Sequence, residues 1–468
     1  MTAGEGVSWW MRDVGGGRSR PPLAGSADVD VAILGAGFTG LWTAHALQSL
    51  APDLRIGIVE AEHVGFGASG RNGGWCTAGL SISWGQLARR HGVRAAQQTA
   101  AAMRDTVTAI AADCVREGID AHVRHSGILR IARGAHEVPI MQAGWEAKVQ
   151  LGLAEGGELL DAEQLSERVH VRDARGAVVD PHGATVHPGR LVTGLATAVE
   201  RRGATIWEGT PVTAVEDRGG TGGRTGARPR LRTAAGDITA DTVVLAGEAF
   251  LSALPGTRRA VLPVYSLIVL TDPLTDDQWR AIGWVGGECL SSHRLTVDYL
   301  ARTDDGRILF GGRGAPYHFG SGIDPSHDRH AATHANLRAQ LLDWFPALDG
   351  LGFTAEWGGA VGLARDWMPT ITHDPRSGIA AAHGYGGQGV ATAHLAGRVL
   401  AHRITGTPDD LLDGLPLVRH RSRRWEPEPV RWLAIRYLQG ALARVDERAA
   451  ASGRAPTGRT LAERLTRH

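Results

Sequence analysis

A glycine-rich turn near the N-terminal end constrains the fold of this chain more than any other feature. The turn Gly35-Ala36-Gly37-Phe38-Thr39-Gly40 lies between an expected buried strand over residues 28–34 and an expected helix over residues 38–50. A second expected strand, over residues 55–60, completes a βαβ unit and ends on Glu60. In such a unit the glycines let a pyrophosphate approach the helix N-terminus, and the acidic residue accepts hydrogen bonds from ribose hydroxyls. The pattern predicts a dinucleotide-binding Rossmann domain of the α/β class.

Length, charge and cysteine usage narrow the possible functions. A chain of 468 residues exceeds the size at which one core keeps growing, so two domains are expected. The formal net charge of +1 gives no reason to expect a nucleic-acid partner. Cys76, Cys114 and Cys289 form no CxxC pair, which favours a reduced, cytoplasmic protein without disulfides or zinc. No apolar run approaches the roughly 20 residues of a membrane-spanning helix, so no membrane span is expected.

Three further glycine-rich segments favour FAD over a nicotinamide dinucleotide. The first, residues 65–74 (GFGASGRNGG), follows the second strand directly, and the second, residues 242–247 (TVVLAG), returns the chain to the same sheet. The third, residues 384–389 (GYGGQG), opens an expected helix over residues 390–404. The N-terminus of such a helix stabilises negative charge on a bound ring. A nicotinamide-dependent dehydrogenase is the alternative interpretation, and a flavin-binding electron-transfer subunit without catalysis is another.

Together these motifs, with RILFGGR (residues 307–313) and DWMP (residues 366–369), resemble the D-amino acid oxidase/glycine oxidase family of FAD-dependent oxidoreductases. The resemblance spans about residues 27–406, and GASGRNGG is most similar to the γ-glutamylputrescine oxidase-like branch. It implies a glutathione-reductase-like, discontinuous FAD-binding Rossmann domain with a mixed-sheet α+β substrate domain. The implied reaction is hydride transfer from an amine-bearing carbon to flavin N5, which gives an imine that hydrolyses to an aldehyde. The implied partners are a small amine or amino acid and either O2 or another electron acceptor.

The resemblance also implies domain ranges and cofactor contacts. We expect a flexible lead over residues 1–26, an FAD-binding domain over 27–86, 183–252 and 357–412, a substrate domain over 87–182 and 253–356, and a helical tail over 413–468. The residues expected to hold FAD are Gly35, Gly37, Phe38, Thr39, Gly40, Glu60, Ala61, Ser69, Arg71, Asn72, Gly73, Gly74, Val212, Gly247, Gly387, Gln388, Gly389 and Val390.

Departures from the family pattern bear on the substrate. Where sarcosine and glycine oxidases place a cation for the substrate carboxylate, this chain has Ala78, Val361 and Ala391. An unpaired carboxylate is costly in a closed site, so we favour an amine without an α-carboxylate. An amino-acid substrate is the alternative, with Arg313 as the carboxylate anchor. Tyr265 and Trp357 are the expected aromatic walls of the substrate pocket.

The same comparison by motif bears on how flavin and oxygen are handled. The cysteine that carries flavin in sarcosine oxidases falls near Gly359 here, so FAD is expected to bind without a covalent link. Lys148 is the only lysine, and its place early in the chain argues against the oxygen-activating role of the sarcosine oxidase lysine. The histidines His327, His330 and His334 have metal-like spacing but no supporting carboxylate or thiolate set. We interpret them as part of a solvated helix and expect no metal.

Overall fold

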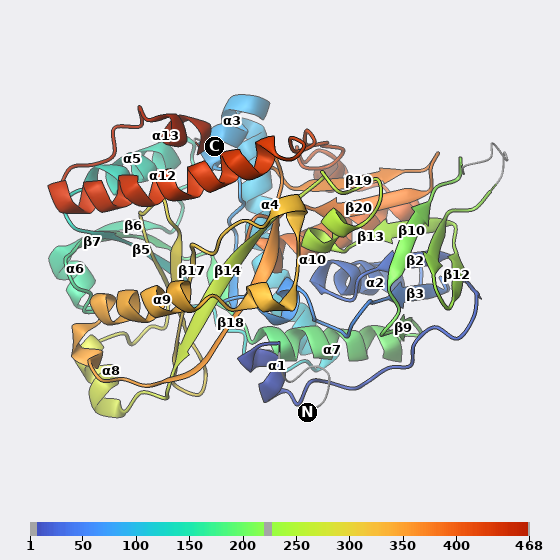
Figure 1. The fold of residues 1–468 in the computed structure, drawn as a ribbon, viewed down its shortest axis with the longest axis horizontal. Coiled ribbons are helices and arrows are strands. Elements are labelled where there is room, and N and C mark those ends of the chain that lie inside the picture. Colours follow the sequence, from blue (N-terminus) through green and yellow to red (C-terminus); the bar gives the residue numbers. More distant parts are fainter. Residues whose placement is uncertain (1–6, 220–226, 467–468) are drawn as a thin grey trace.

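The computed structural model describes residues 7–219 and 227–466, which form two large sheets with helices packed around them (Figure 1). One sheet has six strands and the other eight, and two smaller sheets accompany them. The prediction of an α/β fold, with a discontinuous Rossmann-type sheet and a second mixed sheet, is confirmed.

The six-stranded sheet is assembled from segments that lie far apart in the chain. In spatial order its strands are β19 (Thr370–Asp374), β20 (Ile379–His383), β13 (Thr242–Leu245), β2 (Val31–Leu34), β3 (Ile56–Val59) and β9 (Thr205–Trp207). All neighbours pair in parallel except β19, which pairs antiparallel with β20. Both faces of this sheet are covered, which is why its central strands are nearly continuous runs of Val, Ile and Leu.

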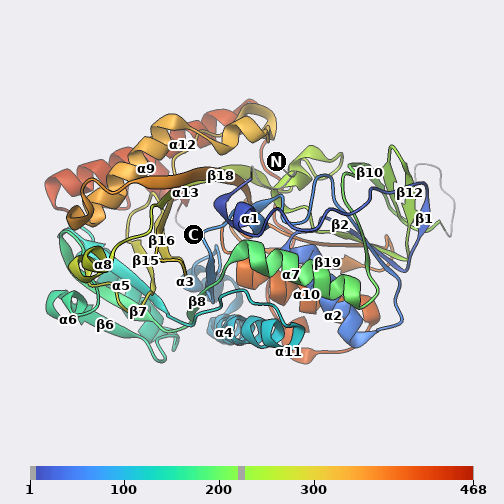
Figure 2. The same cartoon turned by 90° about the horizontal axis from the view of Figure 1, so that it is seen from below.

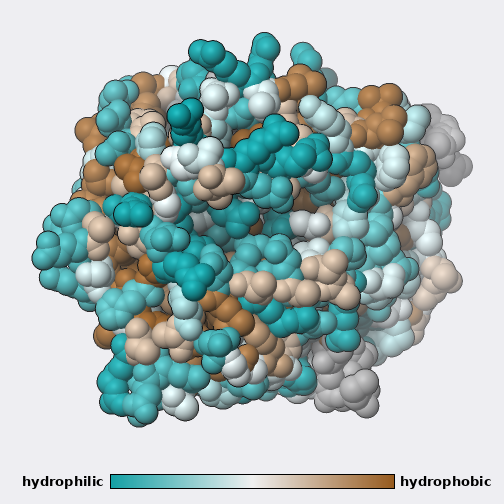
Figure 3. Space-filling view, turned by 60° about the vertical axis from the view of Figure 1, so that its left-hand side comes forward, coloured by the Kyte–Doolittle hydropathy of each residue, from teal (hydrophilic) through white to brown (hydrophobic). Residues whose placement is uncertain are grey.

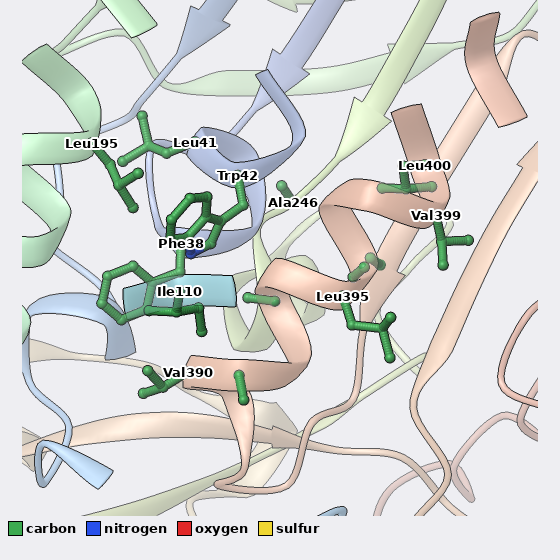
Figure 4. Packing of buried hydrophobic residues seen from close by; sticks show 14 of the residues in the cluster. Phe38, Leu41, Trp42, Ile110, Leu195, Ala246, Val390, Leu395, Val399 and Leu400 are labelled. Atoms are coloured by element: carbon green, nitrogen blue, oxygen red, sulfur yellow. The ribbon is translucent and has the colours of Figure 1, made fainter. Parts of the chain in front are cut away.

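Four helices cover one face of this sheet: α2 (Phe38–Leu50), α4 (Val93–Glu117), α7 (Pro188–Arg201) and α10 (Gly389–Thr405). Figure 4 shows the core they form, in which Phe38 of α2 lies beside Ile110 of α4 and near Val390 of α10. The backbones of α2 and α10 approach closely because Gly397 has no side chain. A Cβ at that position would lie 2.6 Å from the backbone carbon of Trp42. This contact places the N-termini of α2 and α10 beside one another.

A four-stranded sheet covers the opposite face. It contains β1 (Ala27–Asp28), β12 (Gly236–Thr239), β11 (Arg230–Thr233) and β10 (Val212–Glu216). Leu231 and Ile238 of this sheet share a core with Ala32 and Val243 of the six-stranded sheet. The result is a three-layer domain of helices, parallel sheet and small sheet (Figure 2).

The eight-stranded sheet forms the second domain. In spatial order its strands are β18 (Phe353–Leu363), β14 (Leu262–Thr271), β17 (Ile308–Arg313), β16 (Asp298–Arg302), β15 (Cys289–Ser292), β5 (Ile128–Arg133), β7 (Ala174–Asp180) and β6 (Glu158–Asp161). All neighbouring strands are antiparallel except β15 and β5. α9 (Ala331–Trp344) covers one face, and the opposite face looks toward the Rossmann domain.

Shorter elements connect and surround the two domains. The helices are α1 (Trp9–Asp13), α3 (Trp84–His91), α5 (Val138–Gln150), α6 (Ala162–Ser166), α8 (Asp276–Ile282), α11 (Asp410–Asp413), α12 (Val430–Ser452) and α13 (Leu461–Thr466). The short 3-10 helices are η1 (Ala68–Gly70), η3 (Glu248–Ala253), η4 (Phe319–Ser321), η5 (Pro325–Asp328) and η6 (Pro346–Leu348), and β4 (Trp75–Thr77) pairs with β8 (Gly183–Thr185).

The structure divides the chain differently from the expected ranges at three places. Residues 1–6 of the expected flexible lead lie outside the described residues, but residues 7–11 are packed against the rest of the chain, with Trp10 and Met11 buried. Residues 357–363 belong to the eight-stranded sheet because β18 continues through them along β14. α4, expected in the substrate domain, contributes Met103 and Ile110 to the core beneath α2 and α10.

The surface shown in Figure 3 is mostly hydrophilic, with hydrophobic residues in small groups between polar ones. This is the usual character of a globular surface. Among the described residues, no helix combines the length and apolarity needed to cross a membrane.

Candidate active site

A cavity of about 1230 Å³ lies between the two domains and is lined by residues from both. It extends from the glycine-rich loops of the six-stranded sheet to the inner face of the eight-stranded sheet. Pockets for a single small ligand are usually about 300–1,000 Å³. This cavity therefore has room for a large cofactor and a second molecule beside it.

The first glycine-rich turn lines one end of the cavity and has the geometry that its sequence predicts. Gly35 has a φ of 105°, and a Cβ there would lie 2.8 Å from the backbone oxygen of Ala246 on the neighbouring strand. Gly37 lines the cavity with Phe38 and Thr39, at the N-terminus of α2. Gly40 does not line it, because it packs against the turn, where a Cβ would lie 2.0 Å from the oxygen of Gly35. The first-turn N–H groups of α2 favour an anion at this end.

Glu60 lies beside this turn with its carboxylate on the cavity wall. It accepts hydrogen bonds from the backbone N–H of Ala36 at 2.9 Å and of Glu62 at 3.1 Å. Burial raises the pKa of Glu60, and these backbone donors oppose the shift. Each carboxylate oxygen can accept more than one hydrogen bond, so both keep capacity for ribose hydroxyls. Ala61 and Val212 line the cavity near this carboxylate, as expected.

Ser69, Arg71, Asn72 and Gly73 of the loop at residues 69–74 line the cavity. Ser69 Oγ accepts a hydrogen bond from the Phe38 N–H at 2.8 Å, which ties the loop to the start of α2. Asn72 turns its amide back onto the loop, where it donates to the oxygens of Ala68 and Ser69. Its own oxygen accepts from the N–H of Gly74.

Two residues of this loop have structural contacts of their own, and of the two only Arg71 lines the cavity. Arg71 is buried, and its guanidinium is engaged by the backbone oxygen of Phe66 and the carboxylate of Asp328. It therefore fixes the loop to the substrate domain more than it offers charge to a ligand. Gly74 does not line the cavity; its φ is 74°, and a Cβ there would lie 2.7 Å from the oxygen of Val186.

The third glycine-rich loop brings the N-terminus of α10 to the middle of the cavity. Gly387, Gln388, Gly389 and Val390 all line it, as does Gly247 from the end of β13. No side chain caps this helix, and Gln388 instead accepts a hydrogen bond from Thr77 at 3.0 Å.

A buried carboxylate holds this third loop in place. Glu248 Oε1 accepts from the N–H groups of Gly384 at 2.9 Å and Tyr385 at 3.0 Å, and Oε2 accepts from Gly362 at 2.7 Å. Burial raises the pKa of Glu248, and the same three backbone donors oppose the shift. No sequence pattern pointed to this residue, because its partners are more than a hundred positions away in the chain.

The inner face of the eight-stranded sheet supplies the substrate side of the cavity. Arg313 lies on this face, donates a hydrogen bond to the oxygen of Gly386 at 3.1 Å and lies over the ring of Trp367. Tyr299 also faces the cavity, and its hydroxyl is 3.0 Å from Ser266 Oγ. Burial raises the pKa of Tyr299 to about 12, so the phenol stays protonated at neutral pH.

Two expected pocket residues lie elsewhere. Tyr265 is one position from Ser266 on β14, so its side chain points to the opposite face and bonds the backbone of Asp324. Trp357 is buried between the domains, where its ring nitrogen donates to the oxygen of Arg71 at 2.9 Å. Neither lines the cavity among the described residues.

Of the three apolar positions at which related oxidases place a cation, two line the cavity and one does not. Ala78 and Val361 line the cavity, and Ala391 is buried in the core of α10. Lys148 lines the cavity as well and forms an ion pair with Asp180 at 2.7 Å.

The histidines with metal-like spacing do not converge. His334 is fully buried rather than solvated and contacts the oxygen of Trp357, while His327 stacks on His318. Within residues 7–219 and 227–466, no group of three or more His, Cys, Asp or Glu side chains could hold a metal ion.

The family follows from a comparison with known proteins, now that fold and cavity are described. A model of the FAD dependent oxidoreductase (DAO) family matches residues 30–403. The chain belongs to this family. The prediction of an FAD-dependent oxidoreductase is therefore confirmed. The residues present fit FAD, because two uncapped helix N-termini, the close-approach turn at Gly37 and the carboxylate of Glu60 all line one cavity. These groups would hold the pyrophosphate, the ribose and the flavin ring.

Similar proteins include bacterial oxidoreductases. Gamma-glutamylputrescine oxidoreductase of Escherichia coli is 29% identical over 398 residues, which cover 84% of this chain and 87% of that protein. A probable oxidoreductase of Rhizobium meliloti, OrdL, is 28% identical over 411 residues, 87% of this chain and 90% of that protein. Among solved structures, glycine oxidase from Geobacillus kaustophilus has a TM-score of 0.70 at 22% identity and covers 84% of this chain and 99% of that one. That structure shares the fold.

Proposed function

We propose that this enzyme oxidises the C–N bond of a primary or secondary amine that lacks an α-carboxylate. The carbon loses a hydride and the nitrogen a proton, and water hydrolyses the resulting imine to an aldehyde with release of ammonia from a primary amine or of a smaller amine from a secondary one. When bound, FAD supplies the hydride acceptor at N5. The observation that carries the proposal is the apolar character of Ala78 and Val361 on the cavity wall.

The chain's own residues suit the binding of a neutral amine. Ile268, Val361 and Trp367 give the cavity apolar and aromatic surface, which disfavours the ammonium form by desolvation. Tyr299 and Ser266 form a hydrogen-bonded pair on the same wall and offer a donor and an acceptor to the amine nitrogen. The name of the similar E. coli protein, gamma-glutamylputrescine oxidoreductase, supports an amine substrate.

Oxidation of a small amino acid is the second candidate, and Arg313 favours it. Burial lowers the pKa of this guanidinium, and no described carboxylate forms an ion pair with it. Its bond to the Gly386 oxygen leaves other donors open. An α-carboxylate could occupy them, and glycine oxidase and L-proline dehydrogenase are among the proteins that share the fold.

Anaerobic reduction of the flavin separates the two candidates. We expect aliphatic amines to bleach the flavin band faster than glycine, sarcosine or proline does. The variant Val361→Arg should raise the reduction rate with small amino acids about tenfold or more, because it adds a carboxylate partner to the wall. If amino acids reduce the wild-type flavin faster, and Arg313→Ala abolishes that preference, the amine proposal is wrong and Arg313 is the anchor.

We also propose that FAD is held without a covalent bond. Gly359 lines the cavity where related enzymes carry a flavinylated cysteine, and the three cysteines of this chain are buried elsewhere. Acid precipitation should release all the flavin into the supernatant, and yellow colour in the pellet would contradict this. Whether O2 accepts the electrons is measured by peroxide formation per aldehyde formed.

A further inference from the structure

The cavity has a second charged region, distant from the flavin-binding loops. It is lined by Arg130 on β5, by the loop at residues 291–298 after β15 and by α5. Arg130 pairs with Ser291 across β15 and with Val178 across β7, so these side chains share one face of the sheet. Leu129, which precedes Arg130 on β5, points into the core on the opposite face of the sheet.

The strand register places Arg130 in line with the substrate wall. Leu290 pairs with Leu300, so their neighbours Ser291 and Tyr299 lie on the other face, next to each other on adjacent strands. Ser291 in turn lies beside Arg130. Two strand spacings, about 10 Å, therefore separate the backbone at Tyr299 from that at Arg130.

The Arg130 guanidinium has little to bind within the protein. Its Nε donates one long bond, 3.5 Å, to the oxygen of Ser292, and its terminal nitrogens make no hydrogen bond or ion pair with any residue that the structure describes. Lys148 and Arg104, which line the same region, differ because each has a carboxylate partner, Asp180 at 2.7 Å and Glu155 at 3.0 Å.

The two carboxylates that act electrostatically on Arg130, those of Asp298 and Glu137, accept hydrogen bonds from other groups. Asp298 accepts from the N–H and the hydroxyl of Ser292, and Glu137 accepts from the N–H groups of Arg133 and His293. Arg130 is exposed along the cavity wall, and Asp298 and Glu137 act on it through space without forming an ion pair. A guanidinium that no carboxylate pairs with can bind an anion that enters the cavity.

The loop beside Arg130 is firmly held, as a binding site requires. Asp298 and Glu137 fasten its first residues, and Asp446 of α12 accepts from the N–H groups of Leu295 at 3.0 Å and Thr296 at 2.8 Å. Leu442 of the same helix lines the cavity. α12 lies beyond residues 30–403, which the family model matches, so this region is built partly by a segment outside that match.

We propose that Arg130 binds a carboxylate at the end of the substrate remote from the oxidised amine. The proposal rests on amine oxidation as the function and specifies the substrate class: a chain with an amine at one end and a carboxylate at the other. The planar guanidinium can donate two parallel hydrogen bonds to a carboxylate. Ser291 Oγ and the neighbouring backbone can complete the site.

The test compares ε-aminocaproate with its neutral analogue ε-aminocaproamide, and then a homologous series of each. The rate constant for anaerobic flavin reduction at low substrate is measured for the holoenzyme. In the wild type we expect the acid to exceed the amide by about tenfold or more, and in Arg130→Met we expect a ratio near one. Arg130→Lys should keep part of the preference, and Arg104→Met, which removes a paired arginine from the same region, should keep all of it.

A binding measurement separates failure of this proposal from failure of the amine proposal. Caproate, which has no amine, should bind the oxidised holoenzyme in calorimetry and bind Arg130→Met at least about tenfold more weakly. If no amine bleaches the flavin but caproate binding still depends on Arg130, the anion site stands and the amine function is wrong. If amines bleach the flavin while neither the acid-to-amide ratio nor caproate binding depends on Arg130, the anion site is wrong.

Discussion

Replacing Glu137 by glutamine should change how the stability of this protein depends on pH. The side chain is buried, and one oxygen, Oε2, accepts from the N–H groups of Arg133 and His293, both at 3.0 Å. Burial raises the pKa of this carboxyl from an ordinary 4.5 to about 7, against the effect of those donors. At about 1.4 kcal/mol per pKa unit, the difference corresponds to about 3 kcal/mol.

The sign follows from proton linkage. The folded state binds the Glu137 proton more tightly than the unfolded state, so its contribution is fully present below about pH 4.5 and is lost as the pH rises to about 7. Glutamine keeps both hydrogen bonds with its amide oxygen and cannot ionise. The free energy of unfolding of Glu137→Gln, minus that of the wild type, should therefore increase by about 3 kcal/mol between pH 4 and pH 8.

Urea unfolding of the holoenzyme, followed by tryptophan fluorescence at several pH values, measures this difference. The matched control is Glu146→Gln, which removes an exposed carboxyl from the same helix, α5. Its difference from the wild type should stay constant over the same pH range. A constant difference for Glu137→Gln would refute the reasoning, since it would mean that this carboxyl titrates alike in both states.

Three further changes probe the cofactor loops and the C-terminal helix. Gly37→Val should lose flavin absorbance but keep its circular dichroism, because the new side chain would lie beside Ser69, where the pyrophosphate approaches. Gly40→Val should instead unfold, because its Cβ would lie 2.0 Å from a backbone oxygen. Glu248→Ala should lower the free energy of unfolding by about 3 kcal/mol and reduce the flavin content, because three backbone donors lose their acceptor. A variant that denatures like the wild type and keeps its full flavin content would contradict this. Asp446→Asn should raise KM several-fold with little change in kcat, because it loosens the loop beside Arg130; steady-state kinetics with an unchanged KM would exclude that role.

The cofactor end of the site was predictable because its signals are local. Each glycine-rich turn is a continuous stretch whose spacing reports the backbone conformation it needs, and most residues expected from these turns do line the cavity. Gly40 and Gly74 do not line the cavity, because both allow close packing of the backbone instead. A glycine motif looks the same whether the glycine is needed for packing or for contact with a ligand.

The residues at the substrate end of the cavity were not predictable, because the sequence does not show which face of the sheet each side chain of a strand points to. β14 is buried on both sides, so its sequence, LPVYSLIVLT, has no alternation to show which residues face the cavity. A shift of one position exchanges Tyr265 for Ser266, and the structure selects Ser266. Tyr299, an aromatic residue that faces the cavity, fits its strand only because Gly73 and Gly311 leave room for its ring.

No sequence motif identifies the acidic residues that hold the cavity loops, because their hydrogen-bond partners are distant in the chain. Glu137 binds a backbone N–H 156 positions away, Glu248 one 136 positions away and Asp446 one 151 positions away. Each is a carboxylate that fastens a cavity loop through main-chain donors, and Asp446 has Arg294 beside it as well, at 3.9 Å. Backbone N–H groups satisfy a buried carboxylate without placing a cation beside it. Arg130 and Arg313 therefore lie near loops held by carboxylates without being neutralised by them, and the cavity keeps positive charge at two separate places for a ligand to bind.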